Sequence, residues 1–152
     1  MSSSLYHILT QTSIAWLAHY NTFNSPTYSW ATGRTINATH TILPASNGFP
    51  PGLNNTAMQQ NLRTTLPGLH NYSAIRVGDM PTIIDTEKKR IVMHLHGTGT
   101  SDIGPYENEY VFVLETTEDG KLIERSFEFT DSFLLRRYWE GGRLLGWNGT
   151  IP

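Results

Sequence analysis

The chain has 152 residues, which is the size of one domain with a core of its own, so residues 1–152 are expected to form a single domain. Its formal net charge of -2 argues against a nucleic-acid-binding protein, and its lack of cysteine excludes disulfides and thiolate metal sites. No apolar run approaches the roughly 20 residues of a membrane span, so no membrane association is expected.

The first half of the chain predicts two helices separated by a strand. Residues 3–22 place apolar side chains at helical spacing, and a serine ahead of them can supply the N-cap. Residues 35–44 alternate well enough for a short strand that ends at a proline. A loop over 45–55 with a Pro-Pro-Gly turn signal leads into a second helix over 55–65, which a Pro-Gly pair ends.

The second half predicts consecutive antiparallel strands. The first covers residues 71–80, and a short apolar run with a charged turn follows it. Three further strands are expected at about 90–100, 106–116 and 121–131, and a Glu-Asp-Gly turn joins the last two. The tail, residues 133–147, is expected to add one helical turn. This order predicts an α+β domain in which helices pack on one face of a bent sheet.

The start of the chain indicates a cytoplasmic protein. It carries neither the positive charge nor the long apolar run of a secretory signal. Sequons for N-glycosylation occur at Asn37, Asn54, Asn71 and Asn148. They are expected to be incidental, because glycosylation needs a secreted chain.

Ionisable side chains stand among apolar ones in the three consecutive strands. His94 and His96 lie in the first of them, Glu109 in the second, and Asp131 at the end of the third. Burying an unpaired charge is costly, whereas an acid/base pocket needs titratable groups that are partly enclosed. All four are therefore candidate pocket residues.

Alternation places Asp131 on the same strand face as Phe127 and Phe129, with Ser126 and Glu128 on the opposite face. We expect the phenylalanine face to line the interior, with Asp131 in the pocket, and the opposite face to be solvated. The alternative role for Asp131 is to cap the helical turn that follows it.

His94 and His96 share one face of their strand, where they could line a pocket, form a polar outer face or join a dimer interface. A His-x-His pair can also bind metal with a third ligand from His40 or Glu109, but no fuller zinc signature is present and no metal site is expected. The strand of Glu109 is apolar on both faces, so alternation does not decide which face is inner. Two covered faces favour a homodimer.

Arg34 and His40 flank the first predicted strand. The guanidinium of Arg34 suits a carboxylate or enolate oxygen, or else a salt bridge with an acid. His40 could relay protons near neutral pH, or it could be a satisfied core histidine. Aromatic residues in or beside loops, among them Trp30 and Tyr106, could line the mouth of a pocket for a bulky apolar ligand, or simply pack in the core.

Three pieces of the sequence carry a resemblance to a known family. They are Arg34 with His40, Leu43 and Pro44; GPYENEY at 104–110; and EDGKLIERSFEFTDS at 118–132. Together they resemble the SnoaL-like branch of the NTF2-like superfamily. Within that branch the likeness is to small fungal isomerases and cyclases of meroterpenoid pathways, of the terretonin and austinol type. It covers about residues 5–138.

The resemblance implies a cone, in which the concave face of a curved antiparallel sheet and its helices enclose a pocket, often with a dimer through the outer face. It implies catalysis by side chains alone, without a metal or an organic cofactor. Asp131 matches the position near the end of the last strand where related enzymes commonly carry a base. The resemblance also favours Glu109 as an acid/base group.

The sequence thus predicts a cofactor-free isomerase or cyclase for a polyketide- or terpenoid-derived intermediate of fungal secondary metabolism. One carboxylate, Asp131 or Glu109, would remove a proton alpha to a carbonyl, and His40 or His94 would return a proton or polarise the carbonyl. The candidate substrate-binding residues are Trp30, Arg34, His96 and Tyr106. The expected partners are a hydrophobic small molecule and a second copy of the chain.

Two alternatives keep the same fold. One is a dehydratase or an epoxide hydrolase, although His94 and His96 stand where the latter would carry an Arg-x-Asp pair. The other is a non-catalytic binding or dimerisation module, in which the acidic and histidine side chains would face solvent or one another.

Overall fold

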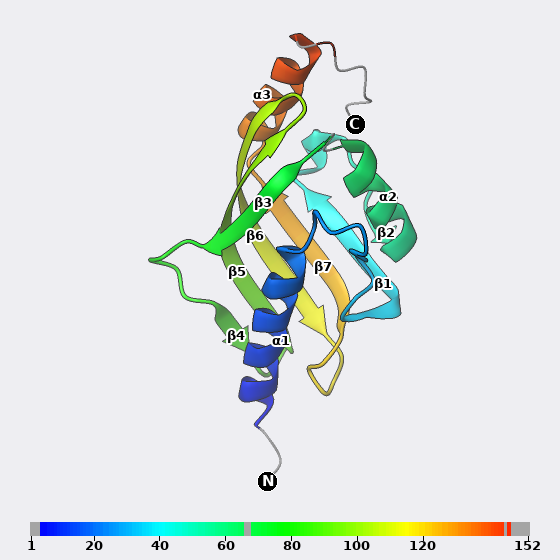
Figure 1. Ribbon diagram of the computed structural model, residues 1–152. Coiled ribbons are helices and arrows are strands. Elements are labelled where there is room, and N and C mark those ends of the chain that lie inside the picture. The colour runs from blue at the N-terminus through cyan, green and yellow to red at the C-terminus, as the bar shows by residue number, and fades with distance from the viewer. Residues whose placement is uncertain (1–3, 66–67, 145, 147–152) are drawn as a thin grey trace.

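The computed structural model describes residues 4–65, 68–144 and 146 of the chain (Figure 1). Its elements are α1 (Leu5–Tyr20), β1 (Arg34–Leu43), the 3-10 turn η1 (Ala45–Asn47), β2 (Leu53–Asn54), α2 (Asn55–Thr65), β3 (His70–Arg76), β4 (Ile83–Asp85), β5 (Arg90–Ser101), β6 (Gly104–Thr116), β7 (Ile123–Thr130) and α3 (Ser132–Leu144). The predicted order of helix, strand, helix and consecutive strands is confirmed. The sequon at Asn148 and the end of the predicted tail lie outside the described residues.

The strands form one seven-stranded sheet in the order β2-β1-β7-β6-β5-β3, and β4 pairs with β5. Antiparallel ladders join β3, β5, β6 and β7, as predicted. β1, however, runs parallel to β7, so the sheet is mixed and not wholly antiparallel. A parallel pair needs a long connection, and nearly the whole domain lies between these two strands. Their register sets His40 beside Ser126 and Ile42 beside Glu128.

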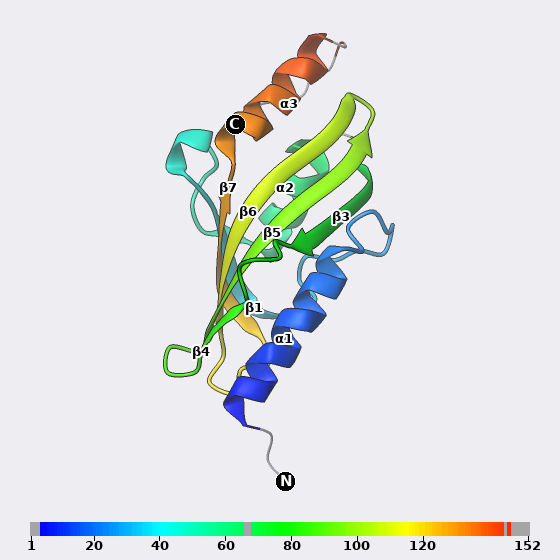
Figure 2. The ribbon, with the colours of Figure 1, turned by 90° about the vertical axis from the view of Figure 1, so that its left-hand side faces the viewer.

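Helix α1 packs along the concave face of the curved sheet, as predicted (Figures 1 and 2). Its buried side chains are Leu9, Ser13, Trp16 and Tyr20, which are three or four residues apart and form one stripe. The rings of Trp16 and Tyr20 reach Phe112 of β6 at centroid distances of 4.7 and 5.5 Å. Neither α1 nor α2 lies on the opposite face of β5, β6 and β7 (Figure 2).

Helix α3 is longer than the single turn that the sequence predicts, because it has 13 residues. It buries Leu135, Tyr138, Trp139 and Gly142 at helical spacing. A Cβ added at Gly142 would lie 2.4 Å from the side chain of Ile103, so this glycine allows close packing of the helix. The glycine pair in the tail suggests a broken helix, and tertiary packing overrides that propensity. Among the described residues, no helix is long and apolar enough to cross a membrane.

Asp131 lies between β7 and α3 and caps the helix. Its Oδ1 accepts hydrogen bonds from the backbone N–H groups of Phe133 at 2.9 Å and Leu134 at 3.1 Å. These bonds satisfy two of the donors that a helix N-terminus leaves free. The capping role weighed for this residue is therefore confirmed.

We expect Asp131→Ala to lower the free energy of unfolding by about 0.5–2 kcal/mol, because it removes the cap of α3. Urea denaturation followed by circular dichroism measures the change. Asp131→Asn is the matched control, since an asparagine side chain caps as well as an aspartate. Equal destabilisation by the two substitutions would contradict the capping role.

Candidate active site

The pairing of β7 with its two neighbours decides which of its faces lines the interior. Glu128 lies between Ile42 of β1 and Phe112 of β6, and both neighbours are buried. Glu128 is only 8% exposed, whereas Phe129 is 47% exposed. The prediction that the phenylalanine face is the inner one, and the Glu128 face the solvated one, is therefore wrong. Register with both neighbouring strands overrides the greater hydrophobicity of the phenylalanine face.

Four side chains form a continuous series of hydrogen bonds inside the cone. His40 Nε2 lies 3.1 Å from Glu128 Oε2, and His40 Nδ1 lies 2.8 Å from Ser126 Oγ. Arg34 Nη2 donates to the same serine oxygen at 2.9 Å. All four residues are buried, and His40 is completely enclosed. We refer to Arg34, Ser126, His40 and Glu128 as the buried polar chain.

Hydrogen-bond donors set the direction of the buried polar chain when Glu128 is ionised. The carboxylate has no proton to give, so His40 Nε2–H donates to it. Nδ1 of the neutral imidazole then accepts the Ser126 hydroxyl proton, and the serine oxygen accepts from Arg34. When Glu128 takes up a proton, both bonds of His40 can reverse. The chain therefore accommodates either protonation state of Glu128 without losing a bond.

Burial governs the ionisation of both nitrogen bases in this chain. It lowers the pKa of His40 below the ordinary 6.5, and the hydrogen bond with Glu128 opposes this effect without cancelling it. Burial likewise lowers the pKa of Arg34 to about 10, which leaves the guanidinium charged at neutral pH. The interior thus holds a neutral imidazole next to a fixed positive charge.

Arg34 is held by neutral groups. Its Nε donates to Asn55 Oδ1 at 3.1 Å, and Nη2 also donates to the carbonyl of Thr39 at 3.0 Å. The guanidinium carbon lies 5.0 Å from the centre of the Trp30 ring, a cation–π contact. Asn55 begins α2, so the second helix anchors this side chain from the concave side.

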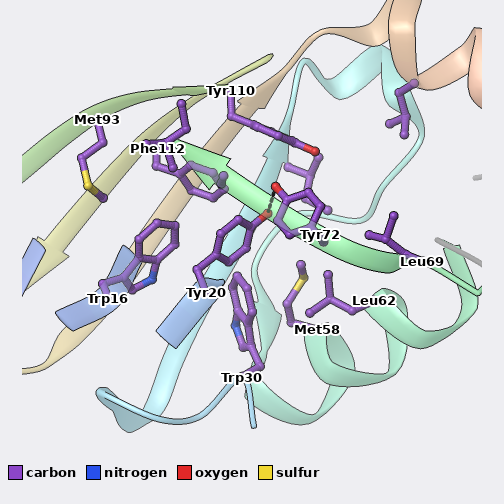
Figure 3. Close-up of a cluster of buried hydrophobic side chains, with 14 of the residues drawn as sticks. Trp16, Tyr20, Trp30, Met58, Leu62, Leu69, Tyr72, Met93, Tyr110 and Phe112 are labelled. Atoms are coloured by element: carbon purple, nitrogen blue, oxygen red, sulfur yellow. Dashed lines mark hydrogen bonds between the residues drawn. The ribbon is translucent and has the colours of Figure 1, made fainter. Parts of the chain in front are cut away.

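A small cavity of about 40 Å³ lies beside Glu128. Its apolar lining residues are Ile42, Phe49, Met58, Leu62 and Leu135. Its polar lining residues are Tyr20, Asn61, Tyr106, Tyr110, Thr130 and Glu128. Figure 3 shows Tyr20, Tyr72 and Tyr110 close together, with Met58 and Leu62 of α2 on the opposite side. A carboxylate, phenols and hydrocarbon side chains therefore meet in one enclosed space.

The outer face of the sheet holds three of the residues that the sequence singles out. His94 Nε2 pairs with Glu109 Oε1, and His96 Nε2 lies 2.9 Å from Glu107 Oε1. The glutamates are more than half exposed, and all four side chains lie on the strand face opposite the buried tyrosines of β6. These residues do not reach the interior cavity.

The structure therefore divides the sequence candidates. Trp30, Arg34, His40 and Tyr106 lie inside the cone, whereas His94, His96, Glu109 and Asp131 lie on the outer face or at the helix cap. Within the described residues, no group of three histidine or acidic side chains is arranged to hold a metal ion.

Sequence reasoning missed Glu128 and Ser126. Both lie on the strand face that was predicted to be solvated, because Phe127 and Phe129 make the other face more apolar. The one signal that points to them is the register with β6, which places Glu128 beside Phe112 and Ser126 beside Leu114. That signal needs the inner face of β6 to be known first.

Comparisons with known proteins place this geometry in a family context. No protein-family model matches the chain. Austinoid biosynthesis clusters protein H of Penicillium brasilianum is 31% identical over 90 residues, which cover 59% of this chain and 60% of that protein. Across three versions of protein H, the match spans only 52–61% of the relative's length.

Solved structures agree with the whole of the fold. BvnE pinacolase of Penicillium brevicompactum superposes with a TM-score of 0.86 and 28% identity, covering 95% of this chain and 100% of that one. A Jannaschia protein assigned as a SnoaL-like polyketide cyclase superposes with a TM-score of 0.69 over 91% of this chain and 95% of that one. Its 9% identity indicates the fold alone. The chain therefore has the fold of the SnoaL-like, NTF2-like cone proteins.

We expect His40 to make the stability of the protein depend on pH. Its pKa is lowered from 6.5 in the folded state, so below pH 6.5 the unfolded chain takes up a proton that the folded protein does not. As the pH is lowered below 6.5, the free energy of unfolding should therefore decrease by up to about 1.4 kcal/mol per pH unit. The decrease should end where the imidazole is protonated in the folded state too.

Urea denaturation between neutral and mildly acidic pH measures this slope. His40→Gln should flatten it, whereas His7→Gln, at an exposed position on α1, should leave it unchanged. Imidazole resonances give a second readout, in which His40 stays neutral at a pH where exposed histidines are charged. A His40 resonance that titrates with the exposed ones would contradict the expectation.

Proposed function

We propose that this protein is a cofactor-free isomerase or cyclase that acts on a polyketide- or terpenoid-derived intermediate in a fungal meroterpenoid pathway. The observation that carries the proposal is the carboxylate of Glu128, which lines an enclosed cavity and is held by His40. Similarity to an austinoid cluster protein and to a pinacolase supports the pathway class and the reaction class.

Glu128 is the general base in this proposal. It removes a proton from a carbon alpha to a carbonyl of the bound substrate and then returns it to another atom of the same molecule. His40 does not line the cavity, so it acts as a positioning residue whose Nε2–H holds one carboxylate oxygen. Arg34 and Ser126 hold the imidazole in turn. A correctly placed acid or base contributes about 10²–10⁴-fold in rate.

The substrate enters from the side of α2 and the loop before it. The cavity of about 40 Å³ is far smaller than the roughly 300–1,000 Å³ of sites for polycyclic ligands. Glu128 and the tyrosines belong to the continuous sheet or to α1, whereas Phe49, Met58 and Leu62 come from α2 and the loop before it. Movement of this second group enlarges the cavity without disturbing the base.

A pinacol-type rearrangement is the second candidate reaction, because the similarity to BvnE pinacolase extends over 95% of the chain. Such a 1,2-shift moves a carbon–carbon bond and needs an acid and a base at oxygen. It does not require cleavage of a C–H bond, so the isotopic content of the substrate distinguishes it from enolisation.

We expect the purified protein to convert one member of a panel of polyketide–terpenoid ketones into a product of equal mass. Glu128→Gln should reduce kcat by about 10²–10⁴-fold, because glutamine keeps the shape but not the basicity. Liquid chromatography with mass detection follows the conversion. Substrate deuterated alpha to the carbonyl should turn over more slowly if enolisation limits the rate, and at an unchanged rate in a pinacol-type shift.

Glu109→Gln is the matched control, since it makes the same change on the outer face of the sheet. It should leave kcat unaltered, and Asp131→Asn should do the same. Full turnover by Glu128→Gln, or loss of turnover in Glu109→Gln, would move the site away from the cavity.

We also propose that the protein is a homodimer through the outer face of β5, β6 and β7. Half-buried Val111, Val113 and Phe127 and exposed Phe129 lie on this face beside the His94–Glu109 pair. The face is apolar at its centre and carries self-complementary acidic and basic groups, which suits a two-fold interface between identical copies.

We expect light scattering after gel filtration to give twice the chain mass. Phe129→Arg should yield monomers, because it sets a charge in the apolar centre of the face. Ile14→Arg is the control, since Ile14 is as exposed, at 46% against 47%, but lies on α1 on the other side of the sheet. Dimers that survive Phe129→Arg and dissociate in Ile14→Arg would place the interface elsewhere.

A further inference from the structure

Four buried tyrosines bring their phenol groups together next to the cavity. Tyr20 comes from α1, Tyr72 from β3, and Tyr106 and Tyr110 from β6, and none is more than 7% exposed. The hydroxyls of Tyr106 and Tyr110 are hydrogen-bonded to each other, and Tyr72 donates to Tyr20 at 3.4 Å (Figure 3). We refer to these four residues as the tyrosine cluster.

The backbone of β5 is shaped to admit this cluster. A Cβ added at Gly97 would lie 2.5 Å from the Tyr72 hydroxyl and 3.0 Å from the ring of Tyr110. Any larger residue at this position would therefore displace the phenols. The absence of a side chain at Gly97 leaves room for polar groups where a sheet core would normally hold hydrocarbon.

The tyrosine cluster supplies neutral hydrogen-bond donors. Burial raises the pKa of Tyr106 and of Tyr110 well above 10, so both keep their protons at any physiological pH. The hydroxyls of Tyr106 and Tyr110 are hydrogen-bonded to each other, and the side chains of Asn108 and Tyr72 also interact with them. Both tyrosines line the cavity, where either hydroxyl can turn its proton toward a bound oxygen.

The hydroxyl of Thr130 independently indicates that the cavity can bind a polar group. It is only 7% exposed and lines the same cavity, yet its hydroxyl has no hydrogen-bond partner within the described part of the chain. Thr130 also lies directly beside Tyr110 in the register of β6 and β7. A buried hydroxyl left without a partner costs about 1–3 kcal/mol, so such groups usually contact a ligand or ordered water.

We propose that Tyr106, Tyr110 and Thr130 form an oxygen-binding subsite that receives the substrate's carbonyl oxygen and holds it as an enolate while Glu128 takes the alpha proton. The inference rests on the proposed function, and it names the substrate class as an enolisable ketone or 1,3-dicarbonyl compound. Phenol and threonine hydroxyls both donate to such an oxygen, and the enclosed site strengthens those bonds.

The step balances within one substrate molecule. Glu128 takes the proton, the electrons of the C–H bond form a carbon–carbon double bond, and the carbonyl π electrons move onto the oxygen. The oxygen then accepts hydrogen bonds from the subsite. Return of the proton from Glu128 to a different atom of the enolate gives an isomer, with no oxidant, reductant or second reactant.

Acetylacetone tests the subsite without knowledge of the natural substrate, because its enolate has an absorbance band of its own. Glu128→Gln provides the right background, since its neutral side chain resembles the base after proton transfer. We expect this variant to bind acetylacetone at neutral pH and to increase the enolate band until it saturates.

Second substitutions in that background locate the binding groups. Tyr110→Phe and Thr130→Val each remove one hydroxyl and should weaken enolate binding by about 10- to 100-fold. Tyr28→Phe is the matched control, because Tyr28 is a buried tyrosine that does not line the cavity, and it should leave the affinity unchanged. Thermal unfolding confirms that each variant is folded.

Two results would overturn the subsite. One is that the Glu128→Gln variant does not bind the enolate. The other is that Tyr110→Phe and Thr130→Val bind it as tightly as Tyr28→Phe does. Either result leaves the proposed function standing, provided that Glu128→Gln still lowers turnover of the ketone panel as expected. Failure of the proposed function appears instead as unchanged turnover in Glu128→Gln.

Discussion

The hydrogen bonds between His40 and its partners on β7 are the constraint on which the interior depends. A carboxylate and an imidazole share a space otherwise filled by aromatic and aliphatic side chains, and each must keep its partners there. A buried polar group without a partner costs about 1–3 kcal/mol, which is a large share of a domain's net stability. The parallel pairing of β1 with β7 meets this need, because it sets His40 and Ser126 side by side.

The two charged side chains of the interior, Arg34 and Glu128, are not in direct contact. Arg34 carries a positive charge and Glu128 a negative one when ionised, yet the two are linked through Ser126 and His40 and make no direct ion pair. A direct pair would occupy both charged groups with each other. The intervening neutral groups leave Glu128 free to face the cavity while the positive charge of Arg34 remains close.

Much of the fold could be read from the sequence because its signals are local. Helical spacing located α1, the Pro-Gly stop marked the end of α2, and the turn at Gly120 located the last hairpin. Three features depend on distant parts of the chain and could not be read: the parallel direction of β1, the length of α3, and the inner face of β7. The last of these hid Glu128, since alternation gives two faces and only pairing with β6 says which one is buried.

The site shows the same division between local and distant information. His40 and Arg34 were identifiable because a titratable group in a short strand stands out by itself. His94, Glu109 and Asp131 stand out in the same way, yet the structure sets them on the outer face and at a helix cap. A titratable side chain in a largely apolar strand marks a residue that needs a partner. The sequence does not say whether that partner is a substrate, a second subunit or a helix terminus.

The small size of the cavity links stability to access. Met58 and Leu62 of α2 are buried against the same space that Tyr110 and Glu128 line, so hydrocarbon packing stabilises the empty protein. In the proposed function, a bulky substrate would replace those contacts with its own apolar surface, and burial of that surface would offset the loss. In the proposed reaction, the base Glu128 is surrounded by fixed donors, which need not reorganise when charge moves onto the substrate.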